Sequence, residues 1–151
     1  MKTKEMIQRL SLFLLALVLT MPAWAQGSNE MSIGSKEDWK AFCQRVNSGQ
    51  TTLNAKLTQD VDLCKEINIV GNSIEQYKGT FDGQGHTLSF DWGQGGDAPF
   101  DFVNSGTIKN LRTKGKITTS GGEASGLLGN AYGTTTISNC VSDVEITSSI
   151  D

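Results

Sequence analysis

The sequence is short of several residue types, and each shortage excludes a class of protein. It has a single histidine, His86, among 151 residues. Ordinary zinc sites and nucleophilic triads depend on histidine, and no serine or cysteine is signalled as its partner. Acidic residues outnumber basic ones by 16 to 13, which argues against nucleic acid as a partner. We therefore predict no catalytic residue, no metal and no cofactor site in this chain.

The chain also lacks an apolar run of the ~20 residues that a membrane-spanning helix needs. The apolar stretch 10–21 is about a dozen residues long, follows the basic residues Lys2, Lys4 and Arg9, and precedes small residues at 22–25. Residues 1–25 are predicted to be a signal peptide, so the mature chain is secreted or at the cell surface, with no stable membrane span. Without them, 10 basic and 15 acidic residues remain, a net charge of about −5.

Proline is scarce, with 2 residues, whereas glycine is common, with 17. From Leu53 onward, apolar residues alternate with polar ones, as at Leu53, Ala55 and Leu57. A period of two with frequent turn residues is typical of short strands that bury one face. The mature chain is predicted to be a β protein.

One helix is expected before the strands. Residues 26–34 have no periodicity and are predicted to be a flexible leader. Ser35 can then cap a helix, with Asp38 completing a capping-box-like pair, and Gly49 follows its end. The helix has one apolar face, made of Trp39, Phe42, Cys43 and Val46. Such a face needs an apolar surface, and we expect it to cover the open end of a stack of strands.

An internal repeat is the strongest signal in the sequence. Similar short units begin near Thr80, Thr107 and Thr136, at steps of 27 and 29 residues. Three sets of apolar residues recur at matched offsets: Phe81, Ile108 and Ile137; Phe90, Ile117 and Ile146; Leu111 and Cys140. Near-constant steps of this length are typical of stacked coils that bury a shared core.

The repeat predicts an all-β right-handed parallel β-helix solenoid with the short amphipathic helix capping its open end. An antiparallel sandwich is the alternative, but a sandwich does not require matched residues at a fixed step. Residues 35–151 are predicted to be the N-terminal part of such a domain, truncated, because solenoids need polar caps at both ends. Further coils or domains of the full-length chain are expected partners.

The motifs resemble those of bacterial surface proteins with GLUG repeats. They are the helix 39–49, the segments 57–63 and 77–88, the segment 106–111, and the signature Gly126-Leu127-Leu128-Gly129. The resemblance implies a pectate-lyase-like β-helix that serves as a display or binding scaffold. Residues 98–101 stand where a second Gly-x-x-Gly element is expected, so this segment departs from the family's pattern and the coil between residues 90 and 107 is expected to be less regular.

Some polar residues are candidates for chemistry, although each also has an ordinary structural role. Six aspartates can bind Ca²⁺ or serve acid/base work on sugars, or simply bond to nearby backbone amides in turns: Asp60, Asp62, Asp82, Asp91, Asp97 and Asp101. Arg112, Lys114 and Lys116 share one strand face near Lys109 and can meet an acidic polysaccharide, or only form a solvated face. Trp92 can stack on a sugar or cover the edge of the core.

Three cysteines leave an odd thiol in an oxidising compartment. Cys43 and Cys64 are the better-matched pair for a disulfide, because they are near each other in sequence. Cys140 falls in the apolar phase of a strand and is expected to be buried.

These observations predict a non-catalytic secreted or cell-surface module for adhesion or recognition, with a glycan or a host or cell-surface ligand as its partner. Two alternatives stay open. The chain is the scaffold portion of a polysaccharide-degrading enzyme, or an accessory domain of a surface peptidase, with the catalytic part beyond residue 151.

Overall fold

The computed structural model describes residues 29–121 and 123–148. The predicted signal peptide and residues 26–28 of the predicted leader lie outside this part of the chain. The described residues form one helix and eleven strands: β1 (Glu30–Ile33), α2 (Lys36–Asn47), β2 (Asn54–Leu57), β3 (Val61–Asp62), β4 (Thr80–Asp82), β5 (Thr87–Trp92), β6 (Phe100–Asn104), β7 (Thr107–Lys109), β8 (Arg112–Thr119), β9 (Leu128–Tyr132), β10 (Thr136–Ser138) and β11 (Val141–Ser148).

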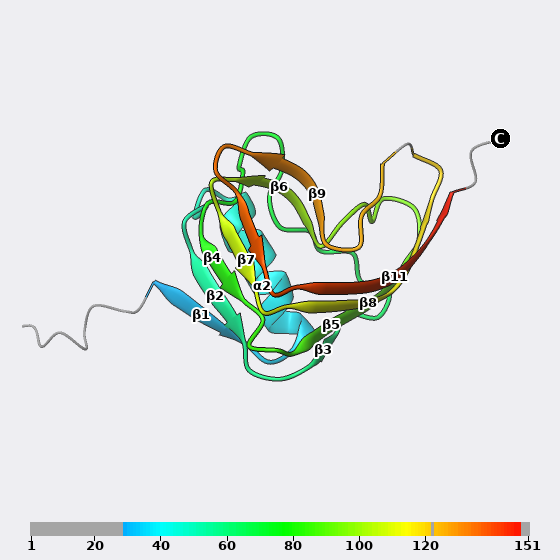
Figure 1. The fold of residues 1–151 in the computed structure, drawn as a ribbon, viewed down its shortest axis with the longest axis horizontal. Coiled ribbons are helices and arrows are strands. Elements are labelled where there is room, and N and C mark those ends of the chain that lie inside the picture. The colour runs from blue at the N-terminus through cyan, green and yellow to red at the C-terminus, as the bar shows by residue number, and fades with distance from the viewer. Residues whose placement is uncertain (1–28, 122, 149–151) are drawn as a thin grey trace, which may run out of the picture.

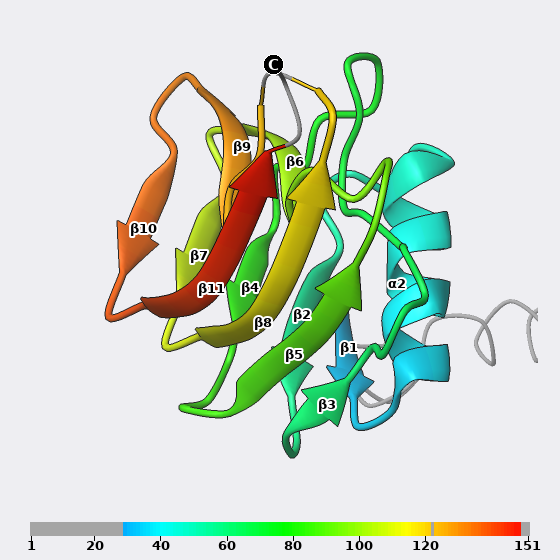
Figure 2. The same ribbon diagram turned by 90° about the vertical axis from the view of Figure 1, so that its right-hand side faces the viewer.

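The strands form three separate parallel sheets. Their strand orders are β1-β2-β4-β7-β10, β11-β8-β5-β3 and β6-β9. Strands of the same sheet lie side by side, and helix α2 lies along the side that holds the earliest strands (Figures 1 and 2). Every strand pair among the described residues is parallel, which excludes the antiparallel sandwich.

The prediction of a right-handed β-helix solenoid capped by a helix was wrong. The structure has three separate parallel sheets and one short helix, and its described residues form no closed helical coil. The repeat specifies which residues of successive strands lie side by side, but it says nothing about how one sheet continues into the next. Residues 63–79, between β3 and β4, form no strand and contribute only isolated bridges from Val70 to Phe100 and from Tyr77 to Val103.

The register predicted by the repeat is present within the sheets. Phe81 pairs with Ile108, and Ile108 pairs with Ile137. The second predicted set is only partly correct, because Ile146 pairs with Ile117 but Phe90 pairs with Gly115. The residue beside Ile117 is Trp92.

The shift at Phe90 comes from the turn that precedes it. Thr80 pairs with Thr107, a step of 27, whereas Thr87 pairs with Arg112, a step of 25. The turn between β4 and β5 is therefore two residues longer than the turn between β7 and β8. A constant step cannot describe both strands of a unit when one of its turns changes length.

Helix α2 is present as predicted, and its cap has the predicted form. The Asp38 amide donates to the Ser35 hydroxyl at 3.1 Å, and a carboxylate oxygen of Asp38 accepts from the Gly34 amide at 3.0 Å. This reciprocal pair satisfies amides at a helix start that have no partner within the helix.

The apolar face of α2 packs into the core. Trp39, Phe42, Cys43 and Val46 are all buried. The Trp39 ring meets Phe81 and Phe100 edge-on at centroid distances of 5.8 and 5.7 Å, and its Nε1 donates to the carbonyl of Asn68 at 2.8 Å. Because residues 29–121 and 123–148 form no closed coil, the helix covers a core built from side chains of two sheets rather than the end of a tube.

Part of the predicted leader is ordered as a strand. Residues 30–33 form β1, which pairs with β2 and buries Ile33. The strand alternates polar Glu30 and Ser32 with apolar Met31 and Ile33, but a run of four residues is too short to predict a strand. The parallel partner β2 supplies the hydrogen-bonding edge that local sequence cannot reveal.

A row of hydrogen-bonded side chains, which we call the amide row, runs across the ends of three strands: Asp82 ends β4, Asn110 follows β7 and Asn139 follows β10. Asn110 Nδ2 donates to Asp82 Oδ1 at 3.0 Å, and Asn139 Nδ2 donates to Asn110 Oδ1 at 2.8 Å. Both asparagines adopt positive φ, 52° and 51°. Asparagine enters this left-handed region more readily than most residues, so it both makes the turn and joins the row.

Candidate functional site

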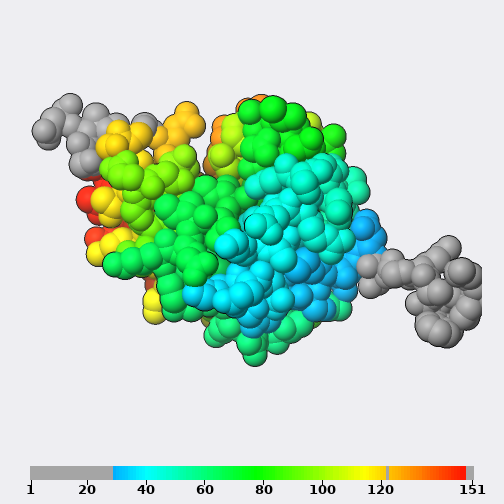
Figure 3. Space-filling model, turned by 180° about the vertical axis from the view of Figure 1, so that it is seen from behind, coloured from blue at the N-terminus to red at the C-terminus, as the bar shows by residue number. Residues whose placement is uncertain are grey.

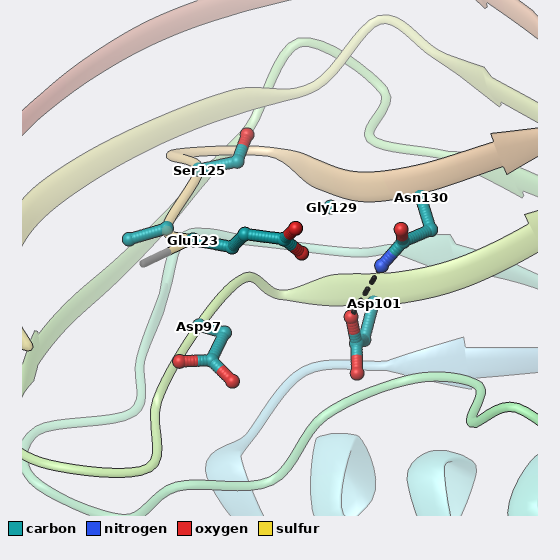
Figure 4. Close-up of a pocket in the computed structure, with 7 residues that line it drawn as sticks. Asp97, Asp101, Glu123, Ser125, Gly129 and Asn130 are labelled. Atoms are coloured by element: carbon teal, nitrogen blue, oxygen red, sulfur yellow. Dashed lines mark hydrogen bonds between the residues drawn. The ribbon is translucent and has the colours of Figure 1, made fainter. Parts of the chain in front are cut away.

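The described residues contain a polar pocket of about 350 Å³, which we call the Asp101 pocket. It is lined by Asp97, Asp101, Glu123, Ala124, Ser125, Gly129 and Asn130. Three carboxylates from separate segments surround one space, and Asn130 Nδ2 donates to Asp101 Oδ1 at 3.2 Å (Figure 4).

The pairing of β6 with β9 brings Asp101 and Asn130 together. Phe100 pairs with Leu128 and Phe102 with Asn130, so Asp101 lies beside Gly129. A Cβ atom on Gly129 would stand 2.9 Å from Asp101 Oδ1. The glycine of the predicted signature therefore leaves room for the Asp101 carboxylate.

Two loops close the pocket at its other side. The Ser125 amide donates to the carbonyl of Asp97 at 2.8 Å, which joins the loop after β5 to the loop before β9. Residues 98–101, where the expected Gly-x-x-Gly element is missing, bury Ala98, Pro99 and Phe100 in the core. Asp101 is then the first residue after this buried run to reach the pocket.

The environment of Asp101 makes its ionisation less favourable than that of a free aspartate. Burial is the largest cause and raises the pKa of Asp101 above its ordinary value, and the negative charges of Asp97 and Glu123 raise the pKa further. The hydrogen bond from Asn130 acts in the opposite direction. A carboxyl group with a raised pKa in a pocket is typical of functional sites.

Asp101 also lines a second, more open groove of about 590 Å³. Its other residues come from the end of α2 and from the segment 67–72, and they include Gln44, Asn47 and Asn72. Figure 3, which views the molecule from behind Figure 1, shows a hollow in the surface beside the part of the chain that includes helix α2. The Asp101 carboxylate thus stands where two depressions of the surface meet.

An aromatic pair lies on the same two strands. The rings of Phe102 and Tyr132 are nearly parallel, at 7° and a centroid distance of 6.2 Å. Tyr132 is 44% exposed, and it follows Asn130 by two residues on β9, so the two side chains share one face of that strand. An accessible aromatic ring therefore lies on the same strand as Asn130 of the pocket, although it is not part of the pocket lining.

The predicted candidates outside the pocket have structural roles. His86 Nδ1 lies 3.5 Å from Asp60 Oδ1. Asp62 and Asp82 accept from the amides of Cys64 and Gln84, both at 2.9 Å, as expected for turn aspartates. The described residues hold no group of three or more His, Cys, Asp or Glu side chains that could bind a metal ion.

The predicted basic stripe is flanked by carboxylates. Lys116 pairs with Asp91 on β5 and with Glu145 on β11, and its Nζ lies 3.5 Å from Glu145 Oε2. Lys114 pairs with Asp143, and Lys109 Nζ lies 3.2 Å from Asp82 Oδ2. The stripe is part of a mixed-charge outer face, which weakens its attraction for an acidic polysaccharide.

The structure also decides between the alternatives that the sequence left open for Trp92 and the cysteines. Trp92 is 1% exposed, stacks on Phe90 at 4.4 Å and donates from Nε1 to the Glu66 carbonyl, so it belongs to the core. Cys43 and Cys64, the pair that the sequence favoured for a disulfide but left open, are both free, Cys43 buried and Cys64 exposed. Cys140 is partly buried rather than buried.

Sequence reasoning found Asp97 and Asp101 but missed Glu123, Asn130 and Tyr132. A usable signal existed for Asn130, which follows Asp101 by 29 residues. The same step separates Thr107 from Thr136, whose pairing the repeat predicted. That step only approximates the register of this sheet, where Phe102 pairs with Asn130 at a step of 28, so Asn130 lies diagonally across from Asp101.

Comparison of the chain with family models, with curated proteins and with solved structures found no match. The resemblance to GLUG-repeat proteins therefore stays a prediction from the motifs. Within the described residues, no helix is both long and apolar enough to cross a lipid bilayer.

Proposed function

We propose that this chain is an exported recognition module, secreted or held at the cell surface, that binds glycans at the Asp101 pocket without cleaving them. The observation that carries the proposal is that the pocket and the exposed Tyr132 ring share the β6–β9 sheet. The motifs that resemble adhesin-like surface proteins point to the same class of function.

The lining groups suit sugar hydroxyls. Carboxylates accept hydrogen bonds from hydroxyl groups, and the Asn130 amide and Ser125 hydroxyl can both donate and accept. The exposed face of Tyr132 offers an apolar surface on which the C–H face of a sugar ring can lie. Three carboxylates repel an acidic sugar, so the expected ligand is a neutral or amine-bearing glycan.

One observation favours a second candidate, a carbohydrate-acting enzyme. The raised pKa of Asp101 is a property of a general acid, and neighbouring carboxylates could supply its partner. The two candidate functions predict different fates for a glycan bound in the pocket. A recognition module returns its glycan unchanged, whereas an enzyme releases new reducing ends.

The test begins with a glycan array probed with the full exported chain, followed by titration calorimetry on the glycans retained. Asp101→Asn and Tyr132→Ala are each expected to weaken binding at least tenfold. Asp91→Asn is the matched control, because Asp91 is an exposed carboxylate of β5 outside the pocket. Asp101→Asn keeps an acceptor for Asn130 and removes a carboxylate that burial disfavours, so it is expected to fold.

The outcomes separate the candidates. Loss of binding in both pocket variants, with unchanged glycan recovered from the wild-type mixture, supports recognition. Reducing ends that appear with wild type and vanish with Asp101→Asn would establish the enzyme instead. Failure to retain any neutral or amine-bearing glycan, or equal affinity for all variants, overturns the proposal.

A further inference from the structure

Each sheet ends, among the described residues, on a strand from the last part of the chain. β9, β10 and β11 are the terminal strands of the three sheets. β10 and β11 lie on the side of the molecule away from helix α2 (Figure 2). An uncovered edge strand presents unpaired backbone groups to which another strand can bind.

The apolar ladders are exposed at this edge. Ile108 is fully buried, but its neighbour Ile137 is 48% exposed. Ile117 is fully buried, but its neighbour Ile146 is 45% exposed. Isoleucines that continue a buried ladder and still face solvent indicate a surface that a further strand would cover.

Charges across the outer face identify the chemistry of that strand. Along one row the residues are Asp91, Lys116 and Glu145, and along the next they are Ser89, Lys114 and Asp143. Opposite charges on neighbouring strands are stabilising and like charges are destabilising. A strand added beside β11 is therefore favoured to place basic residues opposite Asp143 and Glu145.

We propose that the outer edge of β11 binds an extended segment of another polypeptide by strand addition. The segment has apolar or β-branched residues on its inward face, where they cover Ile146, and lysine or arginine on its outward face, opposite Asp143 and Glu145. Backbone hydrogen bonds along β11 provide general affinity, and the alternating side chains provide selection. This inference is independent of the Asp101 pocket.

A second copy of this chain fits the edge poorly. A two-fold axis would pair β11 with itself in antiparallel fashion. With inward residues kept inward and the axis at Val144, Asp143 lies opposite Glu145 of the other copy. Moving the axis to Glu145 sets that residue against itself. Both arrangements oppose like charges, and a basic strand avoids the repulsion.

The probe is a peptide with the sequence of residues 112–119 carrying Gly115→Val, which has basic residues at 112, 114 and 116 and inward-facing residues at 113, 115 and 117. The control peptide has the same inward residues, with Arg112, Lys114 and Lys116 replaced by glutamate. Each is titrated into the full exported chain, labelled with ¹⁵N, and followed by amide chemical shifts. The edge strand β1, which belongs to a different sheet from β11, serves as the internal control.

We expect the basic peptide to shift the amides of residues 141–148, to leave residues 30–33 unchanged, and to bind at least tenfold more tightly than the acidic one. In a chain carrying Asp143→Lys and Glu145→Lys, the preference should reverse. Three results overturn the proposal: no shift in β11, equal affinity for both peptides, or β11 shifts that depend on protein concentration alone and so report a second copy. The wild-type comparison of the two peptides decides the question even if the double variant does not fold.

Discussion

Gly115 lies directly against Phe90. The two residues pair across β5 and β8, and a Cβ atom on Gly115 would overlap the carbonyl oxygen of Phe90. Gly115 also adopts a φ of 139°, a region that side chains rarely tolerate. A glycine in the middle of an eight-residue strand thus permits close approach of two backbones.

Gly115→Ala is expected to lower the free energy of unfolding by about 3 kcal/mol, because the added methyl group forces β5 and β8 apart and strains φ. Gly93→Ala is the matched control, since a Cβ atom there meets nothing within 4 Å. Urea unfolding followed by tryptophan fluorescence measures both. Equal stability of the two variants would contradict the close approach.

Trp39→Ala is expected to cost about 3–5 kcal/mol, since it empties the centre of the aromatic cluster formed with Phe81 and Phe100. It also leaves the Asn68 carbonyl without its donor. Lys40→Ala changes the next, exposed residue of the same helix and should leave stability within about 0.5 kcal/mol. A similar midpoint for both in chemical denaturation would show that α2 is not anchored by Trp39.

Asp82 gives a pH-dependent contribution to stability. Partial burial acts to raise the pKa of Asp82, but hydrogen bonds from Asn110 and Gln84 and the charge of Lys109 outweigh it, so its pKa is lowered. The contribution is full above the ordinary aspartate pKa of about 3.9 and is lost as pH falls below that value through the lower folded-state pKa.

Asp82→Asn should therefore cost about 1 kcal/mol at pH 7 and progressively less below pH ~4. Unfolding free energies measured from pH 7 to pH 2.5, with Asp91→Asn as the surface control, test this. A cost that stays constant over the whole pH range would show that the Asp82 charge contributes nothing.

The three thiols should react at different rates. Burial keeps alkylating reagents away from the Cys43 sulfur. It also raises the pKa of the Cys43 thiol, which lowers the fraction present as the reactive thiolate. Cys64 is exposed and should be alkylated first, with Cys140 slower and Cys43 modified only in denaturant. Peptide mass spectrometry after brief alkylation of the folded chain measures the order. Recovery of a Cys43–Cys64 disulfide would contradict the structure.

The elements that the sequence predicted are those specified by local or periodic signals. Ser35 and Asp38 predict the start of α2 because a cap depends on neighbours three residues apart. Thr80, Thr107 and Thr136 predict parallel register because stacked strands share an apolar phase. Neither signal determines how the sheets join, and the segment 63–79 follows no period.

The Asp101 pocket was harder to predict for a related reason. Asp97 and Glu123 lie in loops whose paths are set by hydrogen bonds such as that from Ser125 to the Asp97 carbonyl. Polar residues in loops carry no hydrophobic pattern that marks their direction. Among the pocket residues that the sequence analysis missed, only Asn130 could have been predicted from the repeat, because strand register fixes its position on β9.

The amide row has a polarity. At each step the later strand supplies the donor and the earlier residue the acceptor, from Asn139 to Asn110 and from Asn110 to Asp82. Asp82 begins the row as a carboxylate that can only accept, and Asn139 ends it with its own Oδ1 as the next acceptor. The row is therefore directional: an N–H group laid over Asn139 would find the Asn139 Oδ1 as its acceptor and would continue the row in the same sense.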